Sequence, residues 1–156
     1  MSKAGYSIAT GTTVGLSAAT AKSVIGVAAA SSFGVDLTGF SVAFDGTSAS
    51  AVPVLVELCY ATFATNAPGT NSTSLTVRQA YGRVITAGFA GARNWIAEPT
   101  VLTAIGNWTL TPNGGLVIRN FPLGQTPDSA VSEGFVIRCT APATVNVQAE
   151  MFFERA

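Results

Sequence analysis

The sequence contains no histidine among its 156 residues. This absence removes the Ser-His-Asp and Cys-His catalytic systems, the commonest general base, and the usual imidazole ligand of zinc and iron. Two cysteines are too few for a four-cysteine metal site. No stretch of the chain matches a P-loop or a dinucleotide-binding motif. The sequence therefore predicts a protein that is not an enzyme, with no catalytic residue, no cofactor-binding residue, no cofactor and no metal ligand.

Charge of either sign is also scarce. Only 10% of the residues are charged, and eight Lys and Arg against eight Asp and Glu give a formal net charge of zero. The basic residues are spread singly along the chain, which argues against a nucleic-acid partner, because phosphate binding needs clustered positive charge. A neutral chain has little electrostatic repulsion to keep its copies apart. We therefore expect a homo-oligomer, and the alternative is a monomer with a Ser-, Thr-, Asn- and Gly-rich surface.

Long apolar runs are missing as well. No stretch approaches the roughly 20 apolar residues of a membrane-spanning helix, and the first seven residues lack the apolar segment of a secretory signal. We expect no membrane partner and synthesis in a reducing cytoplasm. Cys59 and Cys139 each lie in an apolar strand pattern, so buried free thiols are the main expectation. A disulfide between them stays open if their strands pair.

What the chain does have is alternation of apolar and polar residues with a period of two, which predicts β-strands. The clearest runs are 53–63 and 143–154, and in the second run every other residue from Val145 to Phe153 is apolar. Residues 100–110 and 115–121 are predicted to form a hairpin, since Asn113, Gly114 and Gly115 favour positive φ angles.

Further strands are predicted over 22–28, 37–44, 75–85 and 134–140. Asp45-Gly46 predicts a turn, the Pro-Gly-containing stretch 64–74 predicts a loop, and 86–99 reads as irregular. About eight antiparallel strands are typical of an all-β sandwich of the jelly-roll type. We predict one β-sandwich domain over 20–156, preceded by an N-terminal arm or extended segment over 1–19. The predicted core contains Phe44, Val56, Leu58, Ile118, Ile137, Val147 and Phe153.

Three residues in the irregular stretch are candidates for an interface. Phe89 and Trp95 are possible anchors, because aromatic residues dominate interface energetics, and Arg93 lies close to both in the sequence. The rival interpretation is that the two aromatic residues fill the ends of the sandwich itself. A carboxylate pair such as Glu150 and Glu154 is a weak enzymatic candidate, since four residues along a strand span about 13 Å, whereas glycosidases need closer carboxyl groups.

Several segments together resemble a family of small structural proteins from the virions of tailed bacteriophages, of the head-associated type. These segments are TAKSVIGV (20–27), FSVAFDGTSASAVPVLVEL (40–58), EPT (98–100), FPLG (121–124), TAPATVNV (140–147) and FFE (152–154). The resemblance covers residues 20–156. It implies an accessory capsid protein, of the decoration or cement kind, with a β-sandwich fold and often a trimeric assembly.

The resemblance further implies a location in the virion and a partner in the phage major capsid protein or another virion protein. It brings no catalytic motif with it. The alternative function that stays open is a carbohydrate-recognising β-sandwich module of a phage tail or of a secreted protein, for which Trp95, Trp108, Phe121, Tyr60 and Tyr81 are the candidate aromatic platform.

Overall fold

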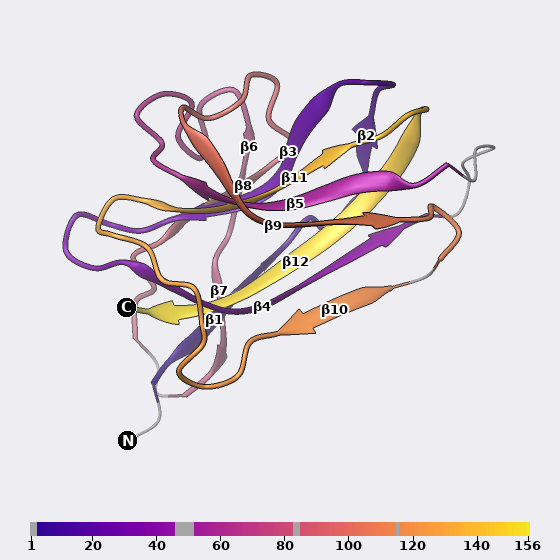
Figure 1. Ribbon diagram of the computed structural model, residues 1–156. Helices are drawn as coiled ribbons and strands as arrows, with labels where there is room; N and C mark the ends of the chain where they lie inside the picture. Colours follow the sequence, from indigo (N-terminus) through magenta and orange to yellow (C-terminus); the bar gives the residue numbers. More distant parts are fainter. Residues whose placement is uncertain (1–2, 46–51, 83–84, 115) are drawn as a thin grey trace.

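The computed structural model describes residues 3–45, 52–82, 85–114 and 116–156. These residues form two sheets of six strands each, packed face to face, in which all paired strands are antiparallel (Figure 1). The first sheet contains β1 (Gly5–Ala9), β2 (Val14–Leu16), β4 (Val35–Phe44), β7 (Arg78–Tyr81), β10 (Val117–Asn120) and β12 (Val145–Arg155). The second sheet contains β3 (Ala21–Ala28), β5 (Val54–Ala61), β6 (Thr73–Leu75), β8 (Ala90–Arg93), β9 (Leu102–Leu110) and β11 (Gly134–Thr140).

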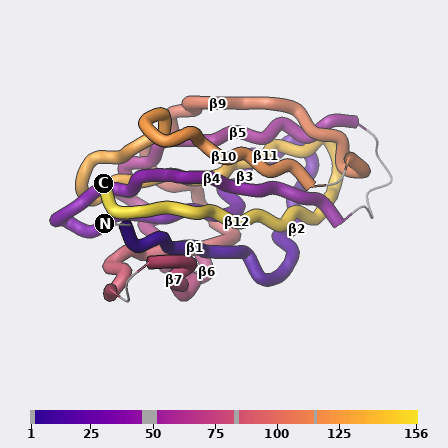
Figure 2. The backbone as a smooth tube through the Cα atoms, turned by 90° about the horizontal axis from the view of Figure 1, so that it is seen from below, coloured from indigo at the N-terminus to yellow at the C-terminus, as the bar shows by residue number. Residues whose placement is uncertain are grey.

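Eight of these strands have the nested pairing of a jelly roll. β1 pairs with β12, β3 with β11, β4 with β10 and β5 with β9. This is the pairing of a long two-stranded ribbon that is rolled up so that successive pairs fall in alternate sheets. The resulting order β10-β4-β12-β1 of the first sheet can be followed in Figure 2. The predicted all-β, antiparallel, jelly-roll-like sandwich is confirmed.

The predicted number of about eight strands is too low, because four short strands extend the eight-stranded jelly roll. Of these four, only β7 lies in a predicted strand (75–85), and β1 of the jelly roll itself lies in the predicted N-terminal arm. β2 pairs with one end of β12, β7 extends the first sheet beside β1, and β8 and β6 extend the second sheet beside β3. Each has only three or four residues, which is too short for an alternating pattern to stand out. β6 therefore overlaps the predicted loop 64–74, and β8 lies in the predicted irregular stretch 86–99.

The predicted hairpin between 100–110 and 115–121 is wrong. Both strands exist, as β9 and β10, but β9 pairs with β5 in the second sheet and β10 pairs with β4 in the first. The turn between them passes from one sheet to the other. Turn residues indicate that the chain reverses and do not determine which strand it meets next. Gly115, and Gly46 of the other predicted turn, lie outside the described residues.

The main core lies between the two sheets, and five of the seven predicted core residues are buried there: Val56, Leu58, Ile137, Val147 and Phe153. Phe44 is only half-buried, and Ile118 is 61% exposed. The prediction for Ile118 is wrong by one residue of register. Val117 stands opposite the buried Val42 of β4, so that Ile118 faces outward.

A second, smaller core covers the outer face of the second sheet. It contains Ala28, Cys59, Ala61, Phe63, Ala92, Trp95 and Val136. The loops that follow β5 and β8 lie over this face and are hydrogen-bonded to each other, for example from the Ile96 amide to the Asn71 carbonyl. β3 is consequently buried from Ser23 to Ala28, which explains the uninterrupted apolar run VIGVA over residues 24–28.

The N-terminal part of the predicted arm 1–19 is a structural part of the sandwich. β1 lies between β12 and β7, and Tyr6 and Ile8 are buried in the main core. The start of β1 and the end of β12 lie at the same end of the molecule (Figures 1 and 2). Among the described residues, no helix has the length and apolar character needed to cross a membrane.

Candidate functional site

Trp95, a predicted interface anchor, lies inside the single chain. It follows β8, is 1% exposed, and stacks on Phe63 with a ring-centroid distance of 6.4 Å. Its indole Nε1 donates a hydrogen bond to the Asn66 carbonyl at 2.8 Å. The geometry matches the rival interpretation, in which this side chain fills the protein's own core, and leaves no surface of Trp95 for a partner.

Phe89 belongs to an aromatic group at one end of the sandwich. Its ring lies 4.8 Å from that of Phe153, 5.5 Å from that of Tyr6 and 5.0 Å from that of Phe33. Phe89 is partly buried and packs against the main core. Its principal contacts are therefore intramolecular, as the rival interpretation expects.

Arg93, the third predicted interface residue, ends β8 and points into the space between the sheets. Its Nη1 donates to the hydroxyl of Thr12. Its Nε is buried and finds no hydrogen-bond partner among the described residues. Arg93 and Arg78 line the same groove, of about 480 Å³, beside β1.

The largest unpaired edge of the sandwich is β9. Among the described residues, five strands are paired on one side only, namely β2, β6, β7, β9 and β10, and β9 has nine residues whereas the others have three or four. Its sequence, LTAIGNWTL, contains no charged residue and no proline. A β-bulge lies in its middle, where Ile105 has no counterpart in β5, and Ile105 is 50% exposed. β9 thus presents an exposed strand edge with an apolar side chain at its centre.

Aromatic residues fill the seam between the two sheets beside β9. Trp108 of β9 stacks on Phe40 of β4 at 5.4 Å, and Phe121 lies 6.1 Å from Phe40. The guanidinium of Arg119 lies over the Phe121 ring. A small hollow of about 70 Å³ remains between these residues and Ile105. This side of the molecule therefore combines an open strand edge with an apolar seam.

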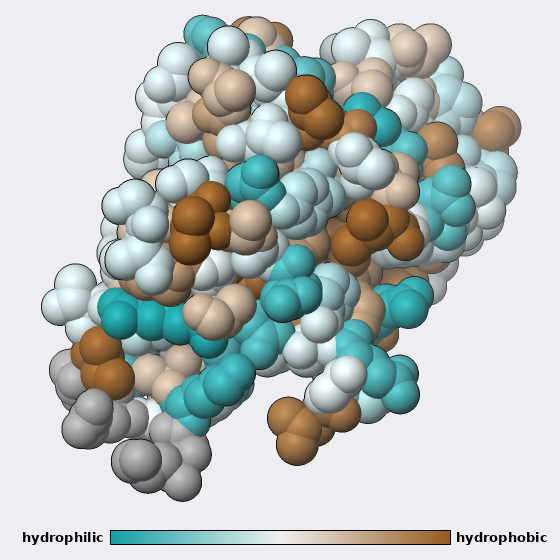
Figure 3. Space-filling model, turned by 60° about the vertical axis from the view of Figure 1, so that its left-hand side comes forward, coloured by the Kyte–Doolittle hydropathy of each residue, from teal (hydrophilic) through white to brown (hydrophobic). Residues whose placement is uncertain are grey.

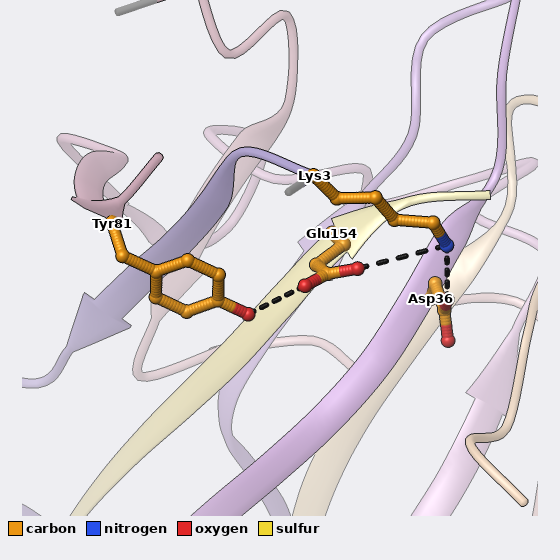
Figure 4. Close-up of polar contacts among 4 residues, drawn as sticks. All are labelled: Lys3, Asp36, Tyr81 and Glu154. Atoms are coloured by element: carbon orange, nitrogen blue, oxygen red, sulfur yellow. Dashed lines mark hydrogen bonds and ion pairs between the residues drawn. The ribbon is translucent and has the colours of Figure 1, made fainter. Parts of the chain in front are cut away.

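A polar cluster lies on the outer face of the first sheet, near the chain ends (Figure 4). The Lys3 ammonium lies 3.0 Å from an Asp36 carboxylate oxygen and 3.6 Å from one of Glu154. The Tyr81 hydroxyl donates to the other Glu154 oxygen at 2.6 Å. These four residues, together with Leu123, Thr38 and Thr126, line a hollow of about 400 Å³.

The contacts within this cluster favour the charged form of Lys3 and the protonated form of Tyr81. The hydrogen bond to Asp36 raises the pKa of Lys3, so Lys3 stays charged at neutral pH. Burial of the phenol, and then its hydrogen bond to Glu154, raise the pKa of Tyr81 to about 12. The phenol therefore stays protonated at neutral pH and acts as a hydrogen-bond donor. The cluster ties the N-terminal segment, β4, β7 and β12 together.

The two carboxylates named from the sequence do not form a pair. Glu150 accepts a hydrogen bond from Ser41 at 3.0 Å, while Glu154 belongs to the Lys3 cluster. A third carboxylate, Glu57, forms an ion pair with Arg138 at 2.8 Å on the second sheet. In the described part of the chain, no three His, Cys, Asp or Glu side chains are grouped so as to hold a metal ion.

Both cysteines are buried free thiols. Their strands pair, but the register sets Cys139 opposite Val56 and Cys59 opposite Val136, so the two residues are not cross-strand neighbours. Burial raises the pKa of Cys59 to about 11 and raises that of Cys139 still further. The thiolate form is therefore disfavoured in the native protein.

Comparison with protein-family models, with curated proteins and with solved structures gave no match to this chain.

Sequence patterns alone did not reveal three of these features. The Lys3 cluster joins Lys3 to Asp36 across 33 positions and Tyr81 to Glu154 across 73 positions, and no local motif links them. The groove likewise brings Thr12 to Arg93 across 81 positions. The exposed edge of β9 was not expected, because the predicted hairpin paired this strand with residues 115–121.

Proposed function

We propose that this chain is a non-enzymatic structural protein that associates with copies of itself, as an accessory protein of a virion shell does. The family resemblance of residues 20–156 is the basis for proposing a location in the virion, a capsid partner and a decoration role. The molecule itself supplies a reason for association, in the form of the β9 edge. The proposal is therefore that β9 is the principal contact between copies.

The observation that carries the proposal is the contrast between β9 and the other four edge strands, of which β2 is a three-residue strand. Sheet edges attract further strands, and proteins usually protect them by shortness, by charged side chains or by proline. β6, β7 and β10 are short, and β7 and β10 each carry an arginine. β9 is long and uncharged, and its bulge is the one protective feature that its sequence and pairing contain.

A second copy is the partner that fits this edge best. An uncharged strand meets no like-charge repulsion when it approaches itself, and strand addition provides main-chain hydrogen bonds along its length. Nine residues of strand extend about 30 Å. The face shown in Figure 3 is mostly of intermediate hydropathy, with separate apolar patches and scattered hydrophilic residues, in agreement with a charged fraction of only 10%.

The symmetry of the assembly follows from what β9 contacts. If β9 pairs with β9 of a second copy, the contact is isologous and gives a dimer. The resemblance implies a trimer, which needs a heterologous contact in which β9 of one copy meets a different surface of the next. The size of the purified oligomer therefore decides between these two arrangements.

The alternative, a carbohydrate-recognising module, shares the fold, because jelly rolls occur in both viral capsid and lectin domains. Its proposed aromatic platform is largely used for packing. Trp95 is buried, Trp108 stacks on Phe40 in the seam, and Tyr60 lies against Phe135. The structural role is therefore the function that the geometry favours.

The experiment that tests the proposal is a charge placed on the β9 edge. Ile105→Lys puts an ammonium where strand addition requires a dry contact, and we expect a folded protein of smaller mass in sedimentation velocity. Leu123→Lys is the matched control, since Leu123 is a fully exposed loop residue outside β9. If Leu123→Lys dissociates the oligomer and Ile105→Lys leaves it intact, β9 is not the contact.

A further inference from the structure

The groove beside β1 is lined by two arginines and by several hydroxyl-bearing side chains. One wall is formed by β1 and the residues that follow it, and the other by β6, the start of β7 and Arg93 at the end of β8. The groove therefore lies where the short additional strands extend the two sheets past the jelly roll. Its volume of about 480 Å³ falls in the range of small-molecule sites.

Arg93 projects into this groove from the second sheet. Residues two apart in a strand face the same side, and a Cβ atom added to Gly91 would lie 3.0 Å from the Ile8 side chain of the first sheet. Arg93 therefore points between the sheets, where its Nη1 reaches Thr12. Its buried Nε is a donor without an acceptor among the described residues. A buried charged donor is costly unless a partner satisfies it.

A second arginine and several hydroxyl groups complete the lining. Arg78 belongs to β7 and stands opposite Ser7 of β1. Neither Arg78 nor Arg93 forms an ion pair with a carboxylate of the described residues, and the groove lining contains no acidic side chain among them. The hydroxyl side chains are those of Ser7, Thr10, Thr12, Ser74 and Thr76. In a protein of zero net charge, this groove concentrates positive charge and hydrogen-bond donors.

We propose that the groove binds an oxyanion of the phosphate or sulfate type between Arg78 and Arg93. The planar guanidinium group donates two parallel hydrogen bonds to such an anion. The guanidinium of Arg93 provides donors for one such fork, and Arg78, which lines the same groove, supplies a second positive charge. The hydroxyl groups provide further donors. The groove has room for more than a bare ion, so the anion is either free or carried by a small organic molecule.

The test is a titration of the ¹⁵N-labelled protein with sodium phosphate and, separately, with sodium sulfate, at constant ionic strength set with sodium chloride. We expect saturable shifts of the backbone amide signals of Thr12, Ser74, Thr76 and Arg93. Chloride alone produces no saturable shift at these positions. If neither phosphate nor sulfate shifts these signals, the proposal is wrong.

Three variants assign the effect to the groove. Arg93→Gln and Arg78→Gln each remove one charged hydrogen-bond donor group, and each is expected to weaken binding roughly tenfold or more. Arg119→Gln is the matched control, because Arg119 is an exposed arginine of β10 outside the groove. Unchanged binding in Arg78→Gln, or an equal loss in Arg119→Gln, overturns the proposal. Since Arg78 is exposed, its replacement leaves the fold intact even if Arg93→Gln does not fold.

A further arm distinguishes the source of the anion. Glucose 6-phosphate, inorganic phosphate and glucose are titrated in parallel. Tighter binding of the sugar phosphate than of inorganic phosphate indicates an organic ligand, and equal binding indicates the free anion; each of these outcomes supports the groove. Binding of glucose with the same affinity as glucose 6-phosphate contradicts it, because recognition then does not depend on the anion.

Discussion

Asp36 and Glu154 stand directly opposite each other in the ladder between β4 and β12, and Lys3 forms an ion pair with both. Like charges at opposite positions of two strands are destabilising. The position of Lys3 therefore explains how the sheet tolerates this pair at neutral pH.

Removal of the ammonium group tests this explanation. Lys3→Met is expected to lower the free energy of unfolding at pH 7 by about 0.2–1 kcal/mol, the range for a largely exposed ion pair. Urea unfolding followed by circular dichroism measures the loss. The difference from wild type should shrink in acid, where the carboxyl groups become neutral. Lys22→Met is the control, since Lys22 donates to the Asn94 amide oxygen; an equal loss in that variant would mean that the carboxylate pair is not the cause.

The same cluster predicts a loss of stability in alkali. The pKa of Tyr81 rises from 10.0 to about 12 on folding, mainly through burial and then through the bond to Glu154. A group whose pKa is raised in the folded state contributes its full stability below its unfolded pKa and loses it as the pH rises toward the folded value. Stability should therefore fall between about pH 10 and 12.

The measurement is thermal unfolding across this pH range in wild type and in Tyr81→Phe. The phenylalanine variant cannot ionise at this position, so its stability should depend less on pH above pH 10. Phenolate absorbance, recorded in parallel, should show a late-titrating tyrosine that the variant lacks. If the two proteins lose stability in parallel throughout, Tyr81 has no part in the alkaline transition.

The core predicts a clear contrast between two apolar residues. Phe153 is fully buried between Tyr6 and Phe89, and Phe153→Ala should cost about 3–5 kcal/mol through lost burial and a cavity. Ile118 is mostly exposed, and Ile118→Ala should change stability by no more than about 0.5 kcal/mol. Denaturant titration gives both values. A large loss of stability in Ile118→Ala would mean that Ile118 is buried, as predicted from the sequence.

The buried thiols predict slow chemical modification. Burial disfavours the thiolates of Cys59 and Cys139, and the thiolate is the reactive form. We expect neither residue to react with iodoacetamide in the native protein at pH 8, and both to react in urea, as mass spectrometry can show. Rapid modification of one cysteine in the native state would place that cysteine at the surface.

The sequence was most informative where a strand is long and has one buried face. β12 and β5 were predicted from their alternation, and β3 was recognised from its β-branched residues. β8 was not predicted, and β6 and β7 were not resolved as separate strands, because three or four residues do not establish a period. The nested order of a jelly roll could be proposed only as a class, since the choice of partner strands depends on contacts between distant segments.

The positions of the candidate site residues also depend on contacts between distant segments. Trp95 and Phe89 were selected because they lie in an irregular stretch, yet loops that fold over the second sheet bury the first, and the end of the sandwich holds the second. Arg93 was selected for its position near these aromatic residues, and its relation to Thr12 depends on the approach of two sheets. The unpaired state of β9 depends on sheet order, which local sequence does not encode.

The mass of the purified protein in solution tests the central proposal most directly. Static light scattering coupled to size-exclusion chromatography, at micromolar concentration, should give a whole-number multiple of the 15.9 kDa chain. A dimer indicates pairing of β9 with itself, and a trimer indicates a heterologous contact of the kind that the resemblance implies. A monodisperse species of one chain mass, unchanged as the concentration is raised and unaltered by Ile105→Lys, would contradict the proposal that this protein assembles with its own copies.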